Sequence, residues 1–132
     1  MENSTFAILE SFCLVTKLQA RTQERKIFWH ESARSSPDAE ILETELNDKV
    51  IVRVSSNSAL VSLKVLIEDN AAQERNILDL SLEHDPESGY KAPVEAPLYR
   101  KLIRLHEFAR RSTFKIDQNL ANTRHYLESL AG

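Results

Sequence analysis

The feature that most constrains the fold is an alternation of apolar and polar residues with a period of two, between positions 41 and 83. Successive side chains of a β-strand point to opposite faces, so this pattern predicts strands with one face turned to a core. The clearest strands are 49–55, 60–68 and 77–83, and no helical period separates them. Parallel neighbours need a long crossover, so the short connections predict an antiparallel meander of four to five strands.

Residues 38–46 allow two interpretations. The stretch 36–40 reads Ser-Pro-Asp-Ala-Glu, which is typical of a helix start because a capping residue precedes a proline and early acids. The stretch 42–46 alternates apolar or β-branched residues with glutamates, which favours a strand. We favour a hairpin of 41–46 and 49–55 that turns at Asn47-Asp48. One further strand is expected at residues 27–30, a β-branched and aromatic run.

Helical periods frame the strands. Residues 4–24 predict a helix with a broad apolar arc, which is typical of a helix packed on two sides. One side of that arc is Phe6, Leu9 and Cys13, and the adjacent side is Ile8, Phe12 and Val15. After residue 98 the period of 3.6 returns, with a stripe at Leu98, Leu102, Leu105 and Ala109. A break near Ser112-Thr113 precedes a last helix, capped by Asp117, that we expect to turn three leucines inward: Leu120, Leu127 and Leu130.

A chain of 132 residues is the right size for one domain with one core. We therefore assign 1–132 to a single α+β domain with a helix at 4–24 and a sheet at 26–84. A connector at 85–97 holds three of the four prolines and the internal glycine, residues that turn a chain without regular pairing. Two C-terminal helices over 98–131 are expected to pack on the sheet.

Positive charge is concentrated in residues 98–115, where six cations face one acid, a local charge of +5 within a chain of net charge −3. The remainder of the chain therefore carries −8, and its segment 38–48 holds five carboxylates without a cation. A spaced basic face can contact nucleic-acid phosphates, but a solvated helix face, partly paired with the acidic remainder, is the favoured interpretation. The basic candidates are Arg100, Lys101, Arg104, Arg110 and Arg111.

The motifs of common enzymes are missing. Two glycines cannot build a glycine-rich phosphate loop, and one cysteine cannot close a disulfide or supply a multi-cysteine zinc site. His30 and His106 each precede a glutamate, but the second histidine of a zinc-hydrolase helix is an arginine in both places. We therefore expect no catalytic, cofactor or metal site and no enzyme. Cys13 is expected to be a buried, inert thiol.

Phe28 and Trp29 are adjacent on a predicted strand, so at most one of them enters the main core. The other must meet a helix, the N-terminal segment or a protein partner, and aromatic residues are favoured at interface centres. This observation, and the contrast between the basic segment 98–115 and the acidic remainder of the chain, favour a protein-binding or accessory module. Such a module would act either as a homodimer or as a subunit beside a larger partner. Nucleic-acid association through the basic helix is the alternative, and an enzyme whose site has no recognisable motif is a remote third option.

The first residues are acidic where a secretory signal would be basic. The apolar stretch 6–18 contains two charges and is too short to span a bilayer. We therefore expect a reduced, cytoplasmic protein with no membrane partner.

Two short motifs carry a resemblance. The string Lys26-Ile27-Phe28-Trp29 opens the predicted sheet, and Ala-Arg-Arg-Ser ends the segment 105–112. Together they resemble a loose group of small uncharacterised bacterial proteins, in which a Lys-Ile-x-Trp strand precedes a meander and a Pro-containing loop precedes an Ala-Arg-Arg-Ser helix. The resemblance implies the same order of elements, and no catalytic residue is carried over from it.

Overall fold

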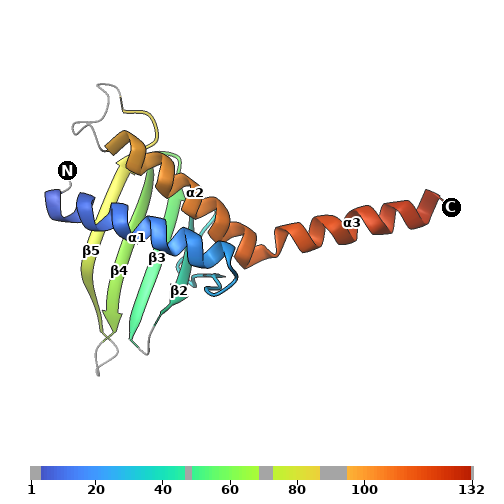
Figure 1. Cartoon of the computed structure of the whole chain (residues 1–132), viewed down its shortest axis with the longest axis horizontal. Coiled ribbons are helices and arrows are strands. Elements are labelled where there is room, and N and C mark those ends of the chain that lie inside the picture. The colour runs from blue at the N-terminus through green and yellow to red at the C-terminus, as the bar shows by residue number, and fades with distance from the viewer. Residues whose placement is uncertain (1–3, 47–48, 69–72, 87–94, 132) are drawn as a thin grey trace.

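The computed structural model describes residues 4–46, 49–68, 73–86 and 95–131. Helix α1 (Thr5–Gln23) precedes the strands β1 (His30–Glu31), β2 (Ala39–Glu45), β3 (Val50–Asn57), β4 (Leu60–Glu68) and β5 (Glu74–Glu83). Helices α2 (Glu95–Phe114) and α3 (Ile116–Ala131) follow (Figure 1). The predicted α+β class and the order of its elements are confirmed.

The five strands form one sheet in the order β1-β2-β3-β4-β5, and every pair is antiparallel. The favoured strand over residues 41–46 is confirmed, because β2 pairs with β3 from Ala39 opposite Asn57 to Glu45 opposite Ile51. The expected turn at Asn47-Asp48 lies outside the described residues.

The strand predicted at 27–30 is wrong in its extent, because β1 contains only His30 and Glu31. The backbone groups of the residues before β1 form hydrogen bonds with side chains and not with a neighbouring strand. Thr44 Oγ1 donates to the carbonyl of Phe28 at 2.8 Å, and Ser112 Oγ accepts from the N–H of Trp29 at 3.1 Å.

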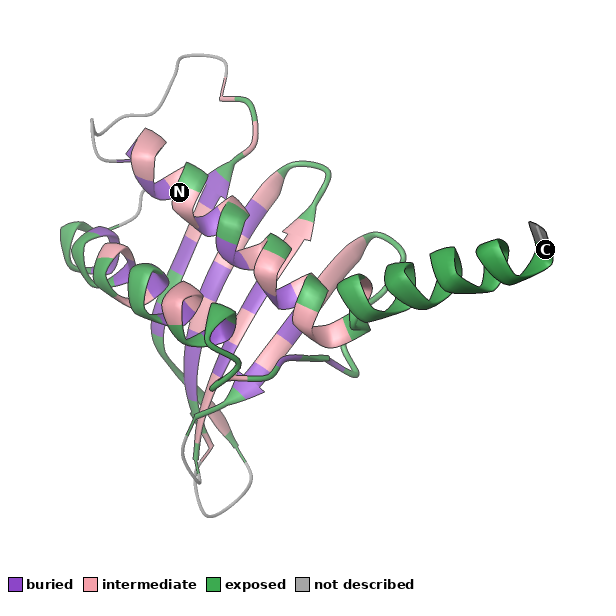
Figure 2. Ribbon diagram, turned by 45° about the vertical axis from the view of Figure 1, so that its right-hand side comes forward, coloured by how far each residue is buried: buried purple, intermediate pink, exposed green. Residues whose placement is uncertain are grey.

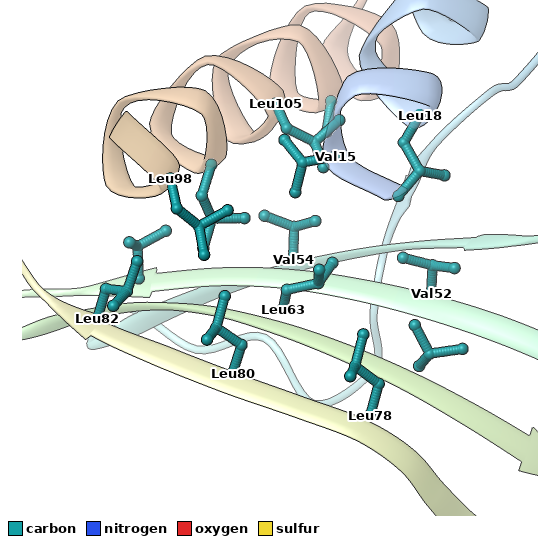
Figure 3. Close-up of a cluster of buried hydrophobic side chains, with 14 of the residues drawn as sticks. Val15, Leu18, Val52, Val54, Leu63, Leu78, Leu80, Leu82, Leu98 and Leu105 are labelled. Atoms are coloured by element: carbon teal, nitrogen blue, oxygen red, sulfur yellow. The ribbon is translucent and has the colours of Figure 1, made fainter. Parts of the chain in front are cut away.

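Helices α1 and α2 lie side by side on one face of the sheet, with α2 over β1 to β4 and α1 against β5 (Figures 1 and 2). Between the layers, leucine and valine side chains from both helices meet those of the strands (Figure 3). The stripe predicted on the basic helix is confirmed, since its four members are fully buried: Leu98, Leu102, Leu105 and Ala109.

Two boundaries of the C-terminal helices differ from the prediction. Helix α2 begins at Glu95 rather than at residue 98, and Pro97 fits there because a helix does not use the N–H groups of its first turn. The break between the helices lies at Lys115, whose φ is 49°, rather than near Ser112-Thr113. The Lys115 carbonyl accepts from the N–H of Asn119, so Asp117 stands in the first turn of α3 and is not its cap.

The burial of α1 corrects two expectations. The helix buries Ile8, Val15 and Leu18 against the sheet and α2, whereas Phe6 and Leu9 are 64% and 61% exposed. Cys13 is exposed as well, so the prediction of a buried thiol is wrong. The reason is that the described elements, α2 and β5, lie against one side of α1, whereas the other side of its apolar arc is exposed.

In β4 the alternation predicted that Ile67 faces the core. Ile67 is 36% exposed, whereas Leu66 is 3% exposed. The pairing shifts between Val65 and Leu66, which leaves Ile77 of β5 as an extra residue, and such a bulge disturbs the alternation locally.

Helix α3 departs most from the prediction. Its leucines were expected to turn inward, yet Leu120, Leu127 and Leu130 are 56%, 57% and 64% exposed. After the left-handed turn at Lys115 the helix projects away from the sheet and is exposed along nearly its whole length (Figures 1 and 2). Of the two C-terminal helices, only α2 therefore packs on the sheet. No described helix is both long enough and apolar enough to cross a membrane.

Candidate functional site

Phe28 and Trp29 point in opposite directions, as adjacent residues of an extended chain should. Trp29 is 4% exposed, and its Nε1–H donates to Thr22 Oγ1 of α1 at 2.9 Å. Phe28 is 68% exposed. The prediction that at most one of the pair enters the core is confirmed, and Phe28 is the residue left for another surface.

Phe28 lines a groove where the end of α1, the end of α2 and the start of α3 meet. Ile27, Phe28 and Phe108 form its apolar part, and three cations line it as well: Arg25, Arg111 and Lys115. Asp117 and Gln118 contribute the edge that belongs to α3. We call this depression the junction groove. Arg25 and Lys115 both have a positive φ, and they are the only non-glycine residues in the described parts of the chain that do.

The basic stripe is divided between two environments. Arg100, Arg104 and Arg111 are exposed along the side of α2 opposite its leucines. Arg111 Nε lies 3.3 Å from Glu107 Oε1, and its guanidinium lies over the Phe108 ring. Within the described ranges, no ion pair involves Arg100 or Arg104. A row of exposed guanidinium groups therefore leads along α2 toward the junction groove.

Lys101 and Arg110 make contacts with other elements of the same chain and do not belong to that row. Lys101 Nζ donates to Thr16 Oγ1 at 3.2 Å, and Arg110 Nε lies 2.8 Å from Glu40 Oε1. Glu40 belongs to the acidic segment 38–48, so part of that segment meets the basic helix within one molecule.

The imidazole of His106, on the side of α2 that faces β2, lies beside the same carboxylate, with Nε2 3.3 Å from Glu40 Oε1. Burial lowers the pKa of the His106 imidazole, and the charge of Arg110 lowers that pKa further. The carboxylates of Glu40 and Glu107 act in the opposite direction, but burial has the larger effect. The imidazole is therefore neutral at pH 7 and fills a structural position against β2.

A serine and a histidine meet at the other end of α2. Ser56 Oγ lies 3.2 Å from Nε2 of His84, which also lies 2.9 Å from the Asn57 carbonyl oxygen, and His84 Nδ1 lies 2.7 Å from the Tyr99 hydroxyl. A carbonyl oxygen only accepts, so Nε2 carries a proton. A general base for Ser56 needs a free lone pair on that nitrogen, so the pair is not an activated nucleophile. No sequence motif indicates this contact, because the two residues are 28 positions apart.

The sheet face opposite the helices carries a network of charges. The Arg53 guanidinium contacts Glu43 at 2.7 Å and Glu74 at 2.6 Å. The hydrogen bonds from Arg53 hold the pKa of Glu74 below its usual value. They do the same for the pKa of Glu43, together with His30 and against the opposing effect of burial. Both carboxylates therefore serve as partners of Arg53, and Arg34, whose guanidinium lies 3.2 Å from Glu74, supplies the second positive charge of the network.

No group of three or more His, Cys, Asp or Glu residues within the described ranges is arranged to hold a metal ion. No protein-family model, curated protein or solved structure matches the chain. The function must therefore be inferred from the geometry of the chain itself.

Helix α3 adds a surface that the sequence did not assign. One stripe runs along the helix at helical spacing through Ile116, Leu120, Leu127 and Leu130. A mixed flank lies beside it, with Asp117, Arg124 and Glu128 on the same side. The amphipathic pattern was visible in the sequence, but a pattern of this kind is equally typical of a helix packed on its own domain.

Proposed function

We propose that this protein is a non-enzymatic protein-binding or accessory module that acts through a protein–protein interface. The interface we assign consists of the apolar stripe of α3 and the adjoining junction groove with Phe28. One observation carries the proposal: Leu120, Leu127 and Leu130 are each more than half exposed on a helix that leaves the body of the molecule.

The energetic argument concerns what keeps α3 helical. Isolated helices of about 12–15 residues are marginal in water, and most helical stability in proteins comes from packing of the apolar face. Helix α3 has 16 residues. Burial of one leucine side chain contributes about 1.5–3 kcal/mol, so covering the α3 stripe would stabilise the helix strongly. Exposed apolar patches with a polar rim are typical of interaction sites, and the cations of the junction groove supply such a rim.

The proposal includes a reduced, cytoplasmic setting. The chain has one cysteine, and Cys13 is exposed on α1. A single exposed thiol persists in a reducing compartment, whereas an oxidising one favours disulfides. Membership in the bacterial group with the Lys-Ile-x-Trp strand is part of the same proposal.

Site-specific photo-crosslinking in the native host tests the function. A photoreactive residue is placed at Leu127, and a matched control is placed at Ile77, which is 51% exposed on β5. We expect specific crosslinked products, identified by mass spectrometry, from position 127 and none from position 77. The absence of products at 127, or the same products from both positions, would refute the proposal.

A second candidate function is association with nucleic-acid backbones through Arg100, Arg104 and Arg111. The observation that favours it is the exposed row on α2, in which two guanidinium groups have no ion-pair partner among the described residues. Phosphate contacts make affinity fall steeply with salt. A gel-shift titration at 20 and 200 mM salt is decisive, with Arg100→Glu/Arg104→Glu expected to abolish the shift. No shift of the wild type at 20 mM salt ends this candidate.

A further inference from the structure

We propose that the partner of α3 is a second copy of this chain. Two α3 helices pair antiparallel, and the tip of each enters the junction groove of the other. This inference rests on the proposed function, because it names the occupant of the same surface.

The placement of the groove explains why the occupant cannot be the α3 of the same chain. A helix of 16 residues is about 24 Å long at 1.5 Å per residue. The groove lies at the base of α3, lined by Asp117 and Gln118, whereas Leu127 and Leu130 lie toward the far end (Figure 1). In an antiparallel pair, the tip of one helix lies at the base of the other. An apolar tip and an apolar groove that cannot meet within one chain then meet between two chains.

One register of the antiparallel pair brings the apolar stripes of the two α3 helices together. Aligning Ile116 with Leu127 of the second copy also sets Leu120 against Thr123 of that copy, since the stripe residues recur at heptad spacing. The same alignment carries Leu130 of the second copy beyond the first residue of α3, toward the end of α2. Ser112 lines the junction groove there beside Phe108. The helix pair and the groove are therefore filled by one arrangement.

The charges on the flank of the stripe fit the same register. Asp117 and Arg124 lie seven residues apart on one side of α3. The antiparallel alignment places Asp117 level with residue 126 of the second copy, about 3 Å along the axis from Arg124 of that copy. The long Arg124 side chain spans this offset, which gives two equivalent ion pairs. Glu128 of each tip comes level with Lys115, one of the groove cations. A parallel pair would instead leave both grooves empty, because the tips of the two helices would then lie together, far from either groove.

Symmetry supports a two-fold assembly. An antiparallel pair of identical helices is isologous, so the interface closes with two copies and does not propagate. The side of α3 away from the stripe is polar and stays in solvent: Gln118, Asn122, His125 and Ser129.

Light scattering of the full-length chain tests the assembly. The chain mass is 15.1 kDa, and we expect a species of twice that mass at tens of micromolar. Leu127→Asp should raise the dimer dissociation constant by on the order of tenfold or more, because it buries an unpaired charge. The matched control His125→Asp, on the polar side of α3, should leave the dimer intact. A wild type that stays monomeric overturns the inference.

A charge exchange tests the antiparallel register. Asp117→Arg and Arg124→Asp should each weaken the dimer, because each sets like charges together. The double variant should restore it toward the wild type. Double-variant weakening as large as that of the single variants overturns the register.

Crosslinking from position 127 separates this inference from the proposed function. Products that contain only this chain support the self-pair. Products with another protein, from a chain that is monomeric by light scattering, overturn the self-pair while the protein-binding function stands.

Discussion

Helices α2 and α3 follow each other in the chain and carry leucines at similar spacing, yet their environments are opposite. In α2, Leu98, Leu102 and Leu105 are completely buried. In α3, the three leucines are 56–64% exposed. The comparison shows that periodicity predicts which face of a helix is apolar, while the neighbouring elements decide whether the same chain covers that face.

The difference arises at one residue. Helix α2 crosses β1 to β4 beside α1, so its stripe always has a strand beneath it. The left-handed conformation of Lys115 then turns the chain away from the sheet (Figure 1). The stripe of α3 therefore continues into solvent, and no helix or strand of the described residues lies beneath it.

The largest expected effect is a difference in unfolding free energy between substitutions in the α2 stripe and in the α3 stripe. Leu102→Ala should lower the free energy of unfolding by about 2–5 kcal/mol, because it opens a cavity between α2 and the sheet. Leu127→Ala should change the free energy of unfolding of the dilute monomer by less than about 0.5 kcal/mol. Urea denaturation below the dimerisation range measures both values. Equal losses for the two variants would show that α3 packs on the body in solution.

The next effect is a difference in unfolding free energy between substitutions of the buried Trp29 and of the exposed Phe28. Trp29→Phe should cost about 1–3 kcal/mol of unfolding free energy, because it removes the hydrogen bond to Thr22 and leaves a gap. Phe28→Leu, at a position 68% exposed, should cost less than about 0.5 kcal/mol. Both are measured by chemical denaturation. A larger loss for Phe28→Leu would mean that the monomer already covers the junction groove.

The third expected effect is a dependence of the folding stability on pH that arises from His106 of α2. Burial lowers the pKa of His106 in the folded protein from its ordinary value of 6.5. The unfolded chain therefore takes up a proton first as the pH falls. The contribution of His106 to stability is fully present above about pH 6.5 and is lost as the pH falls from there through the lower folded-state pKa.

Denaturation midpoints between pH 7.5 and pH 5 test this effect. His106→Asn should flatten the pH dependence over that interval. His125→Asn, at an exposed position of α3, is the matched substitution and should keep the wild-type profile. A wild-type slope in His106→Asn would place the titrating group elsewhere.

The smallest effect compares two arginines that are adjacent in α2. Arg110 reaches Glu40 of β2, whereas Arg111 pairs with Glu107 on its own helix. Both side chains are more than a third exposed, so solvent screens both pairs. Arg110→Gln should lower the unfolding free energy by up to about 1 kcal/mol and Arg111→Gln by about 0.3 kcal/mol or less. Denaturation at low and high salt measures both, and an Arg110→Gln loss that is unchanged by salt would contradict the ion-pair explanation.

Much of the fold was predictable because local patterns reflect local geometry. The alternation in 50–66 predicted β3 and most of β4, and the spacing of Leu98, Leu102 and Leu105 predicted the buried face of α2. The ambiguity at 38–46 was decided correctly in favour of a strand. The prediction at 27–30 failed because Thr44 and Ser112, distant in the sequence, supply the partners of that backbone.

The candidate surface was predicted in part. The sequence predicts that at most one of Phe28 and Trp29 enters the core, and the structure shows that Trp29 does so while Phe28 is exposed. Arg100, Arg104 and Arg111 form the exposed row. Lys101 and Arg110 belong to internal contacts instead, because α1 and β2 come within reach of them only after folding. The sequence predicts that the stripe of α3 faces the core, which is wrong. Residues 116–131 contain no signal of the turn at Lys115, and that turn directs α3 away from the sheet.

The sequence by itself determined the elements, their order and which side of each element is apolar, because strand alternation and helical spacing depend only on the backbone repeat. The tertiary structure decided which apolar sides meet. Burial requires a second surface, and that surface comes from residues far away in the chain. Contact between Trp29 and Thr22 or between Arg110 and Glu40 is therefore a property of the folded molecule. The exposure of α3 has the same origin, since a helix is uncovered only relative to neighbours that the fold has placed elsewhere.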